Sequence, residues 1–280
     1  MSNIINYSID ISVYITVRNE AHRIEACLKR LSWVKEIFIF DKESSDNTVN
    51  ICQNNGATVI NVPNTPKNDK GIELFSKLGS GKWCLFLTAS DLVGEKLKFI
   101  IANAIKKPEI KAISVPYLTY NFGNYVPINP FSRNTKVLLL RRDSVKLSTT
   151  VHMEIGYSEK KVYKIQQPRI SDHESYIVHL ANENFQEYFN KFPRYLQKEA
   201  LSKDNYKVRI HIINLIKDIF NALLLRPSYV FGIRGLLYTT SYLSYVLSRF
   251  TLLTANKHRI DHPHLYKSYE DIRRNRNLNN

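Results

Sequence analysis

Polar side chains follow three apolar segments of the sequence, at the points where those segments end. The three clusters are Thr16 to Glu20, Asp41 to Asp46 and Thr88 to Asp91. Their carboxylate, hydroxyl and amide groups can form hydrogen bonds in defined directions. Because ligands of open parallel sheets bind outside the carboxyl ends of the strands, three such ends in succession predict a ligand site. Each cluster taken alone is also consistent with ordinary loop capping.

The segments around these clusters alternate between strand and helix patterns. Helical spacing over 21–31 and capping residues over 44–48 predict helices between strands. This alternation predicts a parallel sheet with right-handed crossovers and helices on both faces. Later strands are expected to extend it to a mixed sheet. Strands are predicted where β-branched and apolar residues run together, at 11–17, 36–40, 57–62, 83–87, 112–116, 135–141 and 162–165.

The charge of the chain restricts its partners. Forty Lys and Arg residues against 25 Asp and Glu residues give a net charge of +15. Such a charge favours nucleic acid, an anionic membrane surface or phosphorylated substrates. The sequence contains no recognisable nucleic-acid-binding motif, and its basic residues lie beside apolar helical segments, so we predict no nucleic-acid partner.

Composition also indicates the compartment. An apolar content of 44% excludes a disordered chain. Cys27, Cys52 and Cys84 form no metal-binding or redox pattern, so they are predicted to be buried thiols in a reducing compartment. We find neither a signal peptide nor an apolar stretch long enough to span a bilayer, and a cytoplasmic protein is therefore expected.

From about Asn182 onward the pattern is helical and basic. Residues 201–260 contain nine Lys or Arg against two Asp, and the segment 236–250 adds four aromatic residues. Basic residues that flank amphipathic, Tyr-rich helices predict a segment that lies in the interface of an anionic membrane. The alternative is a helical subdomain that packs on the sheet and leaves its basic edges in solvent.

Three motifs, in this order, resemble a known enzyme family. They are Val17-Arg-Asn-Glu20, Leu31-Ser-Trp-Val-Lys-Glu-Ile-Phe-Ile-Phe-Asp41 and Ser44-Ser-Asp-Asn-Thr-Val49. Together they resemble the nucleotide-binding half of inverting family-2 glycosyltransferases with the GT-A fold. The bacterial branch used in lipopolysaccharide-core and capsule assembly is the most similar. The resemblance covers residues 10–95 well and continues more loosely toward the helical tail.

The resemblance implies a domain organisation and a nucleotide site. A GT-A-type, Rossmann-like mixed α/β sheet with helices on both faces would occupy residues 1–180. A helical, basic, membrane-associating region would occupy residues 181–280. Within the first domain, the residues that would line the nucleoside pocket and bind the base or ribose are Thr16, Asn19, Glu20 and Asp41. Asp46 is expected to be structural, because its spacing suits the N-terminus of a helix that starts near Thr48.

The family also holds a divalent cation, Mg²⁺ or Mn²⁺, through an Asp-x-Asp motif that places the metal on the donor diphosphate. Here that place reads Thr88-Ala89-Ser90 and is followed by Asp91. The resemblance therefore implies that the groups near the metal and the diphosphate are Asp91, Ser90 and His179. The leaving diphosphate could instead be stabilised by cationic side chains, for which the candidates are Lys70, Lys82, Arg141 and Arg142.

An inverting transferase needs a base that deprotonates the acceptor hydroxyl as it attacks the anomeric carbon. Val151-His-Met-Glu154 resembles a V-H-E segment of the family, so Glu154 or His152 is the expected catalytic base. In a strand these two side chains would project from the same face. The alternative is an ordinary pair of surface residues.

These observations predict an enzyme, an inverting glycosyltransferase that moves a sugar from a nucleotide-sugar to an envelope glycan or a lipid-linked acceptor. It is expected to be cytoplasmic and peripheral on the inner face of the cell membrane. The alternative is a catalytically silent GT-A-like protein that serves as a membrane-associated binding or assembly subunit, and the missing Asp-x-Asp favours it. A third class is another nucleotide-dependent transferase on the same sheet.

Overall fold

The computed structural model describes residues 8–64, 78–129, 135–146, 156–157, 162–201, 208–257 and 274. It divides into two compact units. The first comprises Met1–Tyr125 and Ser132–Asn184, and the second comprises Val126–Phe131 and Phe185–Asn280. The division after Asn184 lies near the expected boundary at residue 180, whereas the short segment 126–131 belongs with the helical unit.

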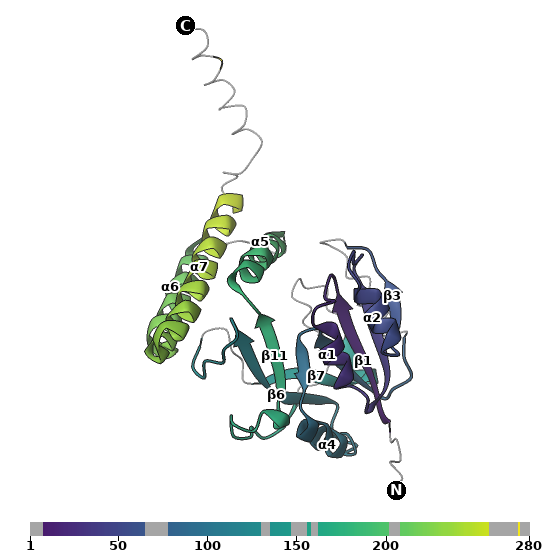
Figure 1. Cartoon of the computed structure of the whole chain (residues 1–280). Coiled ribbons are helices and arrows are strands. Elements are labelled where there is room, and N and C mark those ends of the chain that lie inside the picture. The colour runs from purple at the N-terminus through teal and green to yellow at the C-terminus, as the bar shows by residue number, and fades with distance from the viewer. Residues whose placement is uncertain are drawn as a thin grey trace. The chain divides into compact units, whose positions relative to one another are not determined.

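The first unit is built on a nine-stranded mixed sheet, drawn in purple to green in Figure 1. The order along the sheet is β3-β2-β1-β4-β7-β6-β11-β5, and β10 lies beside β6. The strands at the β3 end are parallel, whereas β7 runs antiparallel to both β4 and β6. The predicted mixed, Rossmann-like α/β sheet is confirmed. Its strands are β1 (Ile9–Val17), β2 (Val34–Asp41), β3 (Thr58–Asn61), β4 (Trp83–Thr88), β5 (Asp91–Val93), β6 (Ala112–Asn121), β7 (Thr135–Arg141), β10 (Tyr163–Lys164) and β11 (Ile177–Asn182).

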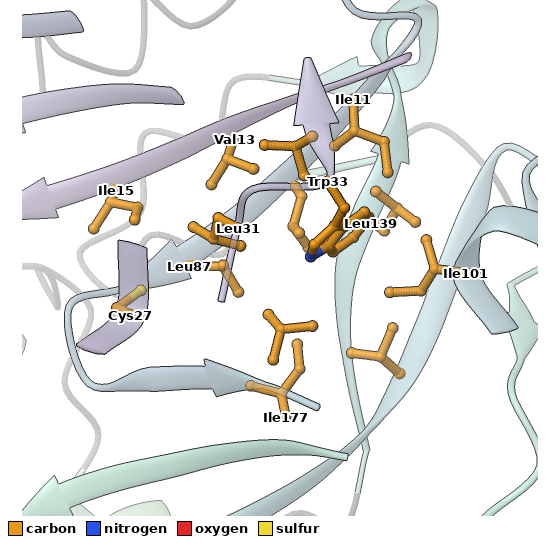
Figure 2. Close-up of a cluster of buried hydrophobic side chains, with 14 of the residues drawn as sticks. Ile11, Val13, Ile15, Cys27, Leu31, Trp33, Leu87, Ile101, Leu139 and Ile177 are labelled. Atoms are coloured by element: carbon orange, nitrogen blue, oxygen red, sulfur yellow. The ribbon is translucent and has the colours of Figure 1, made fainter. Parts of the chain in front are cut away.

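Three helices pack against the same face of this sheet. They are α1 (Ile24–Lys29), α2 (Thr48–Asn54) and α4 (Glu95–Ala104). Alternate residues of a strand point to the same face, and the odd-numbered residues of β1 pack with side chains from all three helices. Figure 2 shows part of this cluster, which gathers side chains from β1, α1, β4, α4, β7 and β11.

The opposite face carries a second, aromatic cluster. Tyr14 stacks on Phe38 and Phe86 with ring centroids 5.6 and 5.4 Å apart. Among the residues that the structure describes, no helix contributes to this cluster. The described helices named above, α1, α2 and α4, pack with the first cluster. Aromatic pairs of this geometry stabilise a fold beyond the free energy of their buried area.

A polar network anchors the amino-terminal ends of β1 and β4. The Glu36 carboxylate accepts hydrogen bonds from the Ser12 hydroxyl at 2.6 Å and from the backbone N–H groups of Ser80 and Gly81. Gly81 is required here because a Cβ at this position would lie 2.5 Å from the backbone nitrogen of Ser12. Burial raises the pKa of Glu36, but these hydrogen bonds outweigh that effect and leave the pKa below its ordinary value.

We expect Glu36→Ala to lower the free energy of unfolding by about 1–3 kcal/mol, because the Ser80 N–H loses its acceptor and the Gly81 N–H keeps only the Ser12 hydroxyl oxygen. A carboxyl group whose pKa is lowered by folding stabilises the protein above its unfolded pKa, near 4.5. The difference between wild type and variant should therefore be full above that pH. It should shrink as the pH falls through the lower pKa of the folded state. Urea unfolding between pH 3 and 7 measures it.

The matched control is Glu25→Ala. Glu25 forms an exposed pair with Lys29 at 2.8 Å on the surface of α1. Such pairs contribute little, so its removal should change stability by less than about 0.5 kcal/mol. Equal losses in the two variants would contradict an anchoring role for Glu36.

The second unit is helical, as expected. It contains α5 (Phe185–Leu201), α6 (Val208–Phe220) and α7 (Gly232–Lys257), with a π-helical turn η3 (Asn221–Leu225) and a short 3-10 turn η4 (Ser228–Phe231) between α6 and α7. The Tyr188 hydroxyl donates to the backbone oxygen of Ser241, which ties α5 to α7. Within the described residues, no helix combines the length and the apolar character that crossing a membrane requires.

Candidate active site

The carboxyl ends of three neighbouring strands lie level with one another. In the register of the parallel pairs, Val17 at the end of β1 faces Asp41 at the end of β2, and Thr16 faces Thr88 at the end of β4. The polar clusters found in the sequence therefore meet at one edge of the sheet. This is the edge at which open α/β sheets bind ligands.

The loops that follow β1 and β2 are tied together by hydrogen bonds. The backbone N–H of Asn19 donates to the Ser44 hydroxyl at 2.9 Å, and the Asn19 side-chain oxygen accepts from the N–H of Ser45 at 2.8 Å. Asn19 has a φ of 55°, a left-handed conformation that asparagine tolerates better than most residues. The Asn19 side chain thus holds the two loops in place, a role that its sequence position alone did not predict.

Asp46 has the structural role expected of it. Its carboxylate accepts a hydrogen bond from the backbone N–H of Thr48, the first residue of α2, at 3.0 Å. It also accepts from the N–H of Ala21 at 3.1 Å. Burial raises the pKa of Asp46, but the hydrogen bonds dominate and lower it overall.

Asp41 is almost completely buried at the end of β2, with an exposed fraction of 3%. One carboxylate oxygen, Oδ2, accepts from the N–H of Ser44 at 3.0 Å. The other, Oδ1, has no hydrogen-bond partner among the described residues. A buried carboxylate oxygen without a donor costs free energy, and such groups often mark a place where a bound molecule supplies the donor.

The other predicted nucleoside contacts are arranged differently. The Glu20 carboxylate forms an ion pair with Arg23, so an internal partner occupies it. Thr16 lies in β1 between Phe40 of β2 and Thr88 of β4, and its side chain is partly exposed. Among these residues Asp41 retains the clearest capacity to bind a ligand donor.

Asp91 lies at the start of β5 and is 1% exposed. Its Oδ2 accepts hydrogen bonds from the N–H and the hydroxyl of Thr88 at 2.7 and 3.0 Å. Its Oδ1 accepts from the Tyr117 hydroxyl at 2.7 Å and lies 2.8 Å from His179 Nδ1. A carboxylate has about four acceptor positions, so the protein itself fills all of them.

This arrangement does not fit the metal role expected of Asp91. Mg²⁺ is usually held in proteins by one or two carboxylates together with substrate phosphates and water. Asp91 has no acceptor position left, and within the described part of the chain no three His, Cys, Asp or Glu side chains form a group that could hold a metal ion. Burial raises the pKa of Asp91, but hydrogen bonds led by that from His179 outweigh burial and keep it below its ordinary value.

His179 in β11 is oriented by this carboxylate. Because an ionised carboxylate only accepts hydrogen bonds, the Nδ1 atom of His179 carries the proton in this contact. Ser90 Oγ lies 3.4 Å from the same nitrogen, and the Tyr117 ring packs against the imidazole with centroids 5.4 Å apart. The other ring nitrogen, Nε2, is therefore available for a ligand on a side chain that is 18% exposed.

Lys136 completes this cluster. Its Nζ atom lies 3.9 Å from the centroid of the Tyr117 ring. In the antiparallel pair of β6 and β7, Lys136 pairs with Val115, two residues before Tyr117. The Tyr117 hydroxyl donates to Asp91, so the Lys136 ammonium lies close to the Asp91–His179 pair. Sequence reasoning missed Lys136 and Tyr117, because both lie in strands that meet β4 and β5 only in the folded sheet.

The arginines considered as diphosphate ligands lie elsewhere. Arg141 pairs with Trp83, the first residue of β4, and binds Asp143. The Arg142 guanidinium donates to Ser12 at 2.7 Å. Both lie at the amino end of β4, five residues or about 17 Å from Thr88, because β7 runs antiparallel to β4. Lys82 directly precedes β4 at the same end.

Three other candidates fall outside the described residues. These are the expected catalytic bases, His152 and Glu154, and the candidate diphosphate cation Lys70. Their roles stay predictions.

Comparison with known proteins gives structural neighbours at low identity. No protein-family model matches the chain. The structure is similar to glucosyl-3-phosphoglycerate synthase from Mycobacterium tuberculosis in complex with Mn²⁺, UDP and glucosyl-3-phosphoglycerate. The sequence identity is 16% and the TM-score is 0.46. The alignment covers 68% of this chain and 77% of the synthase. A mannosyltransferase from Pyrobaculum calidifontis in complex with GDP-Man and Mn²⁺ is also similar, with 13% sequence identity and a TM-score of 0.44. The alignment covers 95% of this chain and 83% of the mannosyltransferase. Similarity at this level assigns no activity to the chain.

Proposed function

We propose that this protein is a glycosyltransferase that takes a sugar from a nucleotide-sugar donor and transfers it with inversion. The observation that carries the proposal is the convergence of Asp41, Thr88 and the Asp91–His179 pair at one edge of the sheet. These are the places where the sequence motifs put the nucleoside and the diphosphate. The motifs occur in the order of the GT-A family, and the polar residues that follow their strands lie at the same edge of the sheet.

Asp41 supplies the nucleoside contact in this proposal. Its Oδ1, to which none of the described residues donates, can accept a hydrogen bond from a base N–H or a ribose hydroxyl. The rigid crosslinks between Asn19 and Ser45 hold the surrounding loops without the ligand. A preformed acceptor of this kind reduces the entropy lost on binding.

Lys136 acts on the diphosphate in this proposal, and His179 lies close by. As the bond between the anomeric carbon and the diphosphate oxygen breaks, negative charge develops on the leaving group and needs cations or hydrogen-bond donors. The ammonium of Lys136, beside the Tyr117 ring, is a described cation of this cluster. With its proton on Nδ1, His179 can only accept a hydrogen bond at Nε2, as from a hydroxyl of the donor. Meanwhile the acceptor oxygen bonds to the anomeric carbon from the opposite face, and its proton goes to the catalytic base, for which Glu154 and His152 are the candidates.

The acceptor is an envelope glycan or a lipid-linked saccharide in this proposal, as in the lipopolysaccharide and capsule enzymes that the motifs resemble. The net charge of +15 supports attachment to an anionic membrane surface, which would place the enzyme at the inner face of the cell membrane. A lipid-linked acceptor and a membrane-attached enzyme would meet at that surface.

Removal of divalent metal tests the donor site. Because the described residues do not fit Mg²⁺ or Mn²⁺ through protein carboxylates, we expect turnover of the nucleotide-sugar in EDTA to stay within about threefold of that in Mn²⁺. Released nucleoside diphosphate, followed for each common donor, measures the rate. A loss of 100-fold or more that Mn²⁺ restores would show that a metal is held after all.

The silent binding subunit is the second candidate, and the replacement of Asp-x-Asp by Thr88-Ala89-Ser90 favours it. The same assay separates the two functions. Turnover of any donor supports the transferase. A nucleotide-induced rise in melting temperature without turnover supports a binding subunit, and the absence of both contradicts the nucleotide site itself.

A further inference from the structure

Exposed apolar side chains gather at the turn between α6 and α7, which we call the hairpin tip (residues 223–236). The two helices lie side by side in the second unit, drawn in green and yellow-green in Figure 1. The residues of the tip with large, exposed apolar side chains are Leu223, Leu224, Leu225, Tyr229, Val230, Phe231, Ile233 and Leu236. Ile233 is 69% exposed, Leu225 64% and Val230 62%. Contiguous exposed patches of this kind mark interaction sites.

The tip is a folded structure rather than an open loop. The buried Ser228 hydroxyl hydrogen-bonds that of Thr239 at 2.7 Å, and the Tyr229 hydroxyl donates to the backbone oxygen of Leu223 at 2.9 Å. Gly235 allows this packing, because a Cβ there would lie 1.6 Å from the backbone oxygen of Ser228. The apolar side chains are therefore presented to the surroundings by a fixed backbone.

The tyrosines of α7 are largely buried. Tyr238 is 1% exposed, and Tyr242 and Tyr245 are half-buried. They pack within the helical unit because the face of α7 that carries them lies against its neighbours. Large apolar side chains are exposed at the tip and also along α6, where Ile216 is 60% exposed and Phe220 49%.

Charge indicates the partner. The sequence contains no Asp or Glu between Asp218 and Asp261, and Asp218 itself pairs with Arg249. Arg226 and Arg234 are exposed within the tip. An apolar surface with basic residues and no acidic ones is complementary to an anionic bilayer. A symmetric contact between two copies would instead bring these arginines toward one another.

We infer that the hairpin tip inserts its apolar side chains into an anionic phospholipid bilayer, with Arg226 and Arg234 at the level of the phosphate groups. This inference names the element that performs the membrane attachment proposed above, and it does not depend on glycosyl transfer. Insertion of apolar side chains supplies binding that salt does not screen, and the arginines add selectivity for anionic lipid.

Co-sedimentation with vesicles of phosphatidylglycerol and phosphatidylcholine tests the inference on the full chain. The triple variant Leu224→Ser, Val230→Ser, Ile233→Ser should bind about 50-fold more weakly than wild type, because three largely exposed side chains lose their apolar transfer free energy. Arg234→Gln should weaken binding about fivefold on anionic vesicles and have no effect on pure phosphatidylcholine. The matched control is Phe99→Ser with Ile170→Ser, which removes exposed apolar side chains of the first unit and should leave binding unchanged.

Two results would overturn the inference. One is equal vesicle binding by wild type and the triple variant. The other is a concentration-dependent dimer of the wild type, without vesicle binding, that the triple variant abolishes. If circular dichroism shows that the triple variant is unfolded, Tyr229→Trp provides the test. Quenching of the fluorescence of the introduced tryptophan by brominated lipid would support insertion, and no quenching would contradict it. Because none of these measurements uses a sugar donor, failure here and failure of the transferase proposal are distinguishable.

Discussion

Replacing Asp41 with alanine is expected to weaken the binding of a nucleotide-sugar or nucleoside diphosphate about 10- to 100-fold. The variant removes the carboxylate oxygen that has no donor in the described structure, and a hydrogen bond to a charged group contributes about 1.5–3 kcal/mol. Isothermal titration with the preferred donor measures the change. Asp41→Asn should give a smaller loss, because an amide oxygen still accepts one hydrogen bond.

Folding and site effects must be separated in this experiment. Asp41 also accepts from the N–H of Ser44, so the alanine variant loses some stability at the loop. Asp10→Asn is the matched control, since Asp10 is exposed at the opposite end of the sheet, where it pairs with Lys35. A folded Asp41→Ala protein that binds nucleotide as tightly as wild type would contradict the nucleoside site.

Replacing Asp91 with asparagine is expected to reduce kcat about 100-fold while the affinity for nucleotide changes by less than about threefold. Asparagine cannot accept all four hydrogen bonds, so His179 loses the partner that fixes its orientation and the site of its proton. Groups that assist proton transfer or stabilise the leaving group commonly contribute 10²–10⁴-fold. Initial rates over a range of donor concentration separate kcat from KM.

A positioning role for Asp91 has a spectroscopic consequence. Nitrogen chemical shifts of the His179 ring should show the proton on Nδ1 in the wild type and a mixture of tautomers in Asp91→Asn. Tyr117→Phe removes one of the four hydrogen bonds and keeps the ring that packs on His179, so its loss of kcat should be intermediate. Asp143→Asn, at the far end of β4, is the control and should leave kcat unchanged. Unaltered ring shifts in Asp91→Asn would contradict the role.

Local patterns of the sequence determined the fold class and the edge of the sheet at which the polar clusters meet. The runs of β-branched residues predict β1, β2, β3, β4 and β7 within a few residues. A buried strand must be apolar along its length, and ligand groups of a parallel sheet must follow its strands, so both leave a signal in short segments. Asp41 and the structural role of Asp46 follow from this signal.

The contacts of Asp91, at the proposed diphosphate site, were decided by tertiary structure alone. Asp91 is followed by apolar residues and resembles a metal ligand in the sequence, yet contacts from Thr88, Tyr117 and His179 fill its acceptor positions. These partners lie up to 88 residues away, in strands that become neighbours only when the sheet assembles.

Strand direction and helix packing were likewise not encoded locally. Arg141 and Lys136 occupy one strand, yet pairing with β4 holds Arg141 at the amino end of β4, whereas Lys136 lies over the Tyr117 ring. In the helical unit, composition indicates an amphipathic, basic segment. Which of its apolar residues are buried and which remain exposed depends on how α6 and α7 pack, because burial is a property of neighbours rather than of residue type.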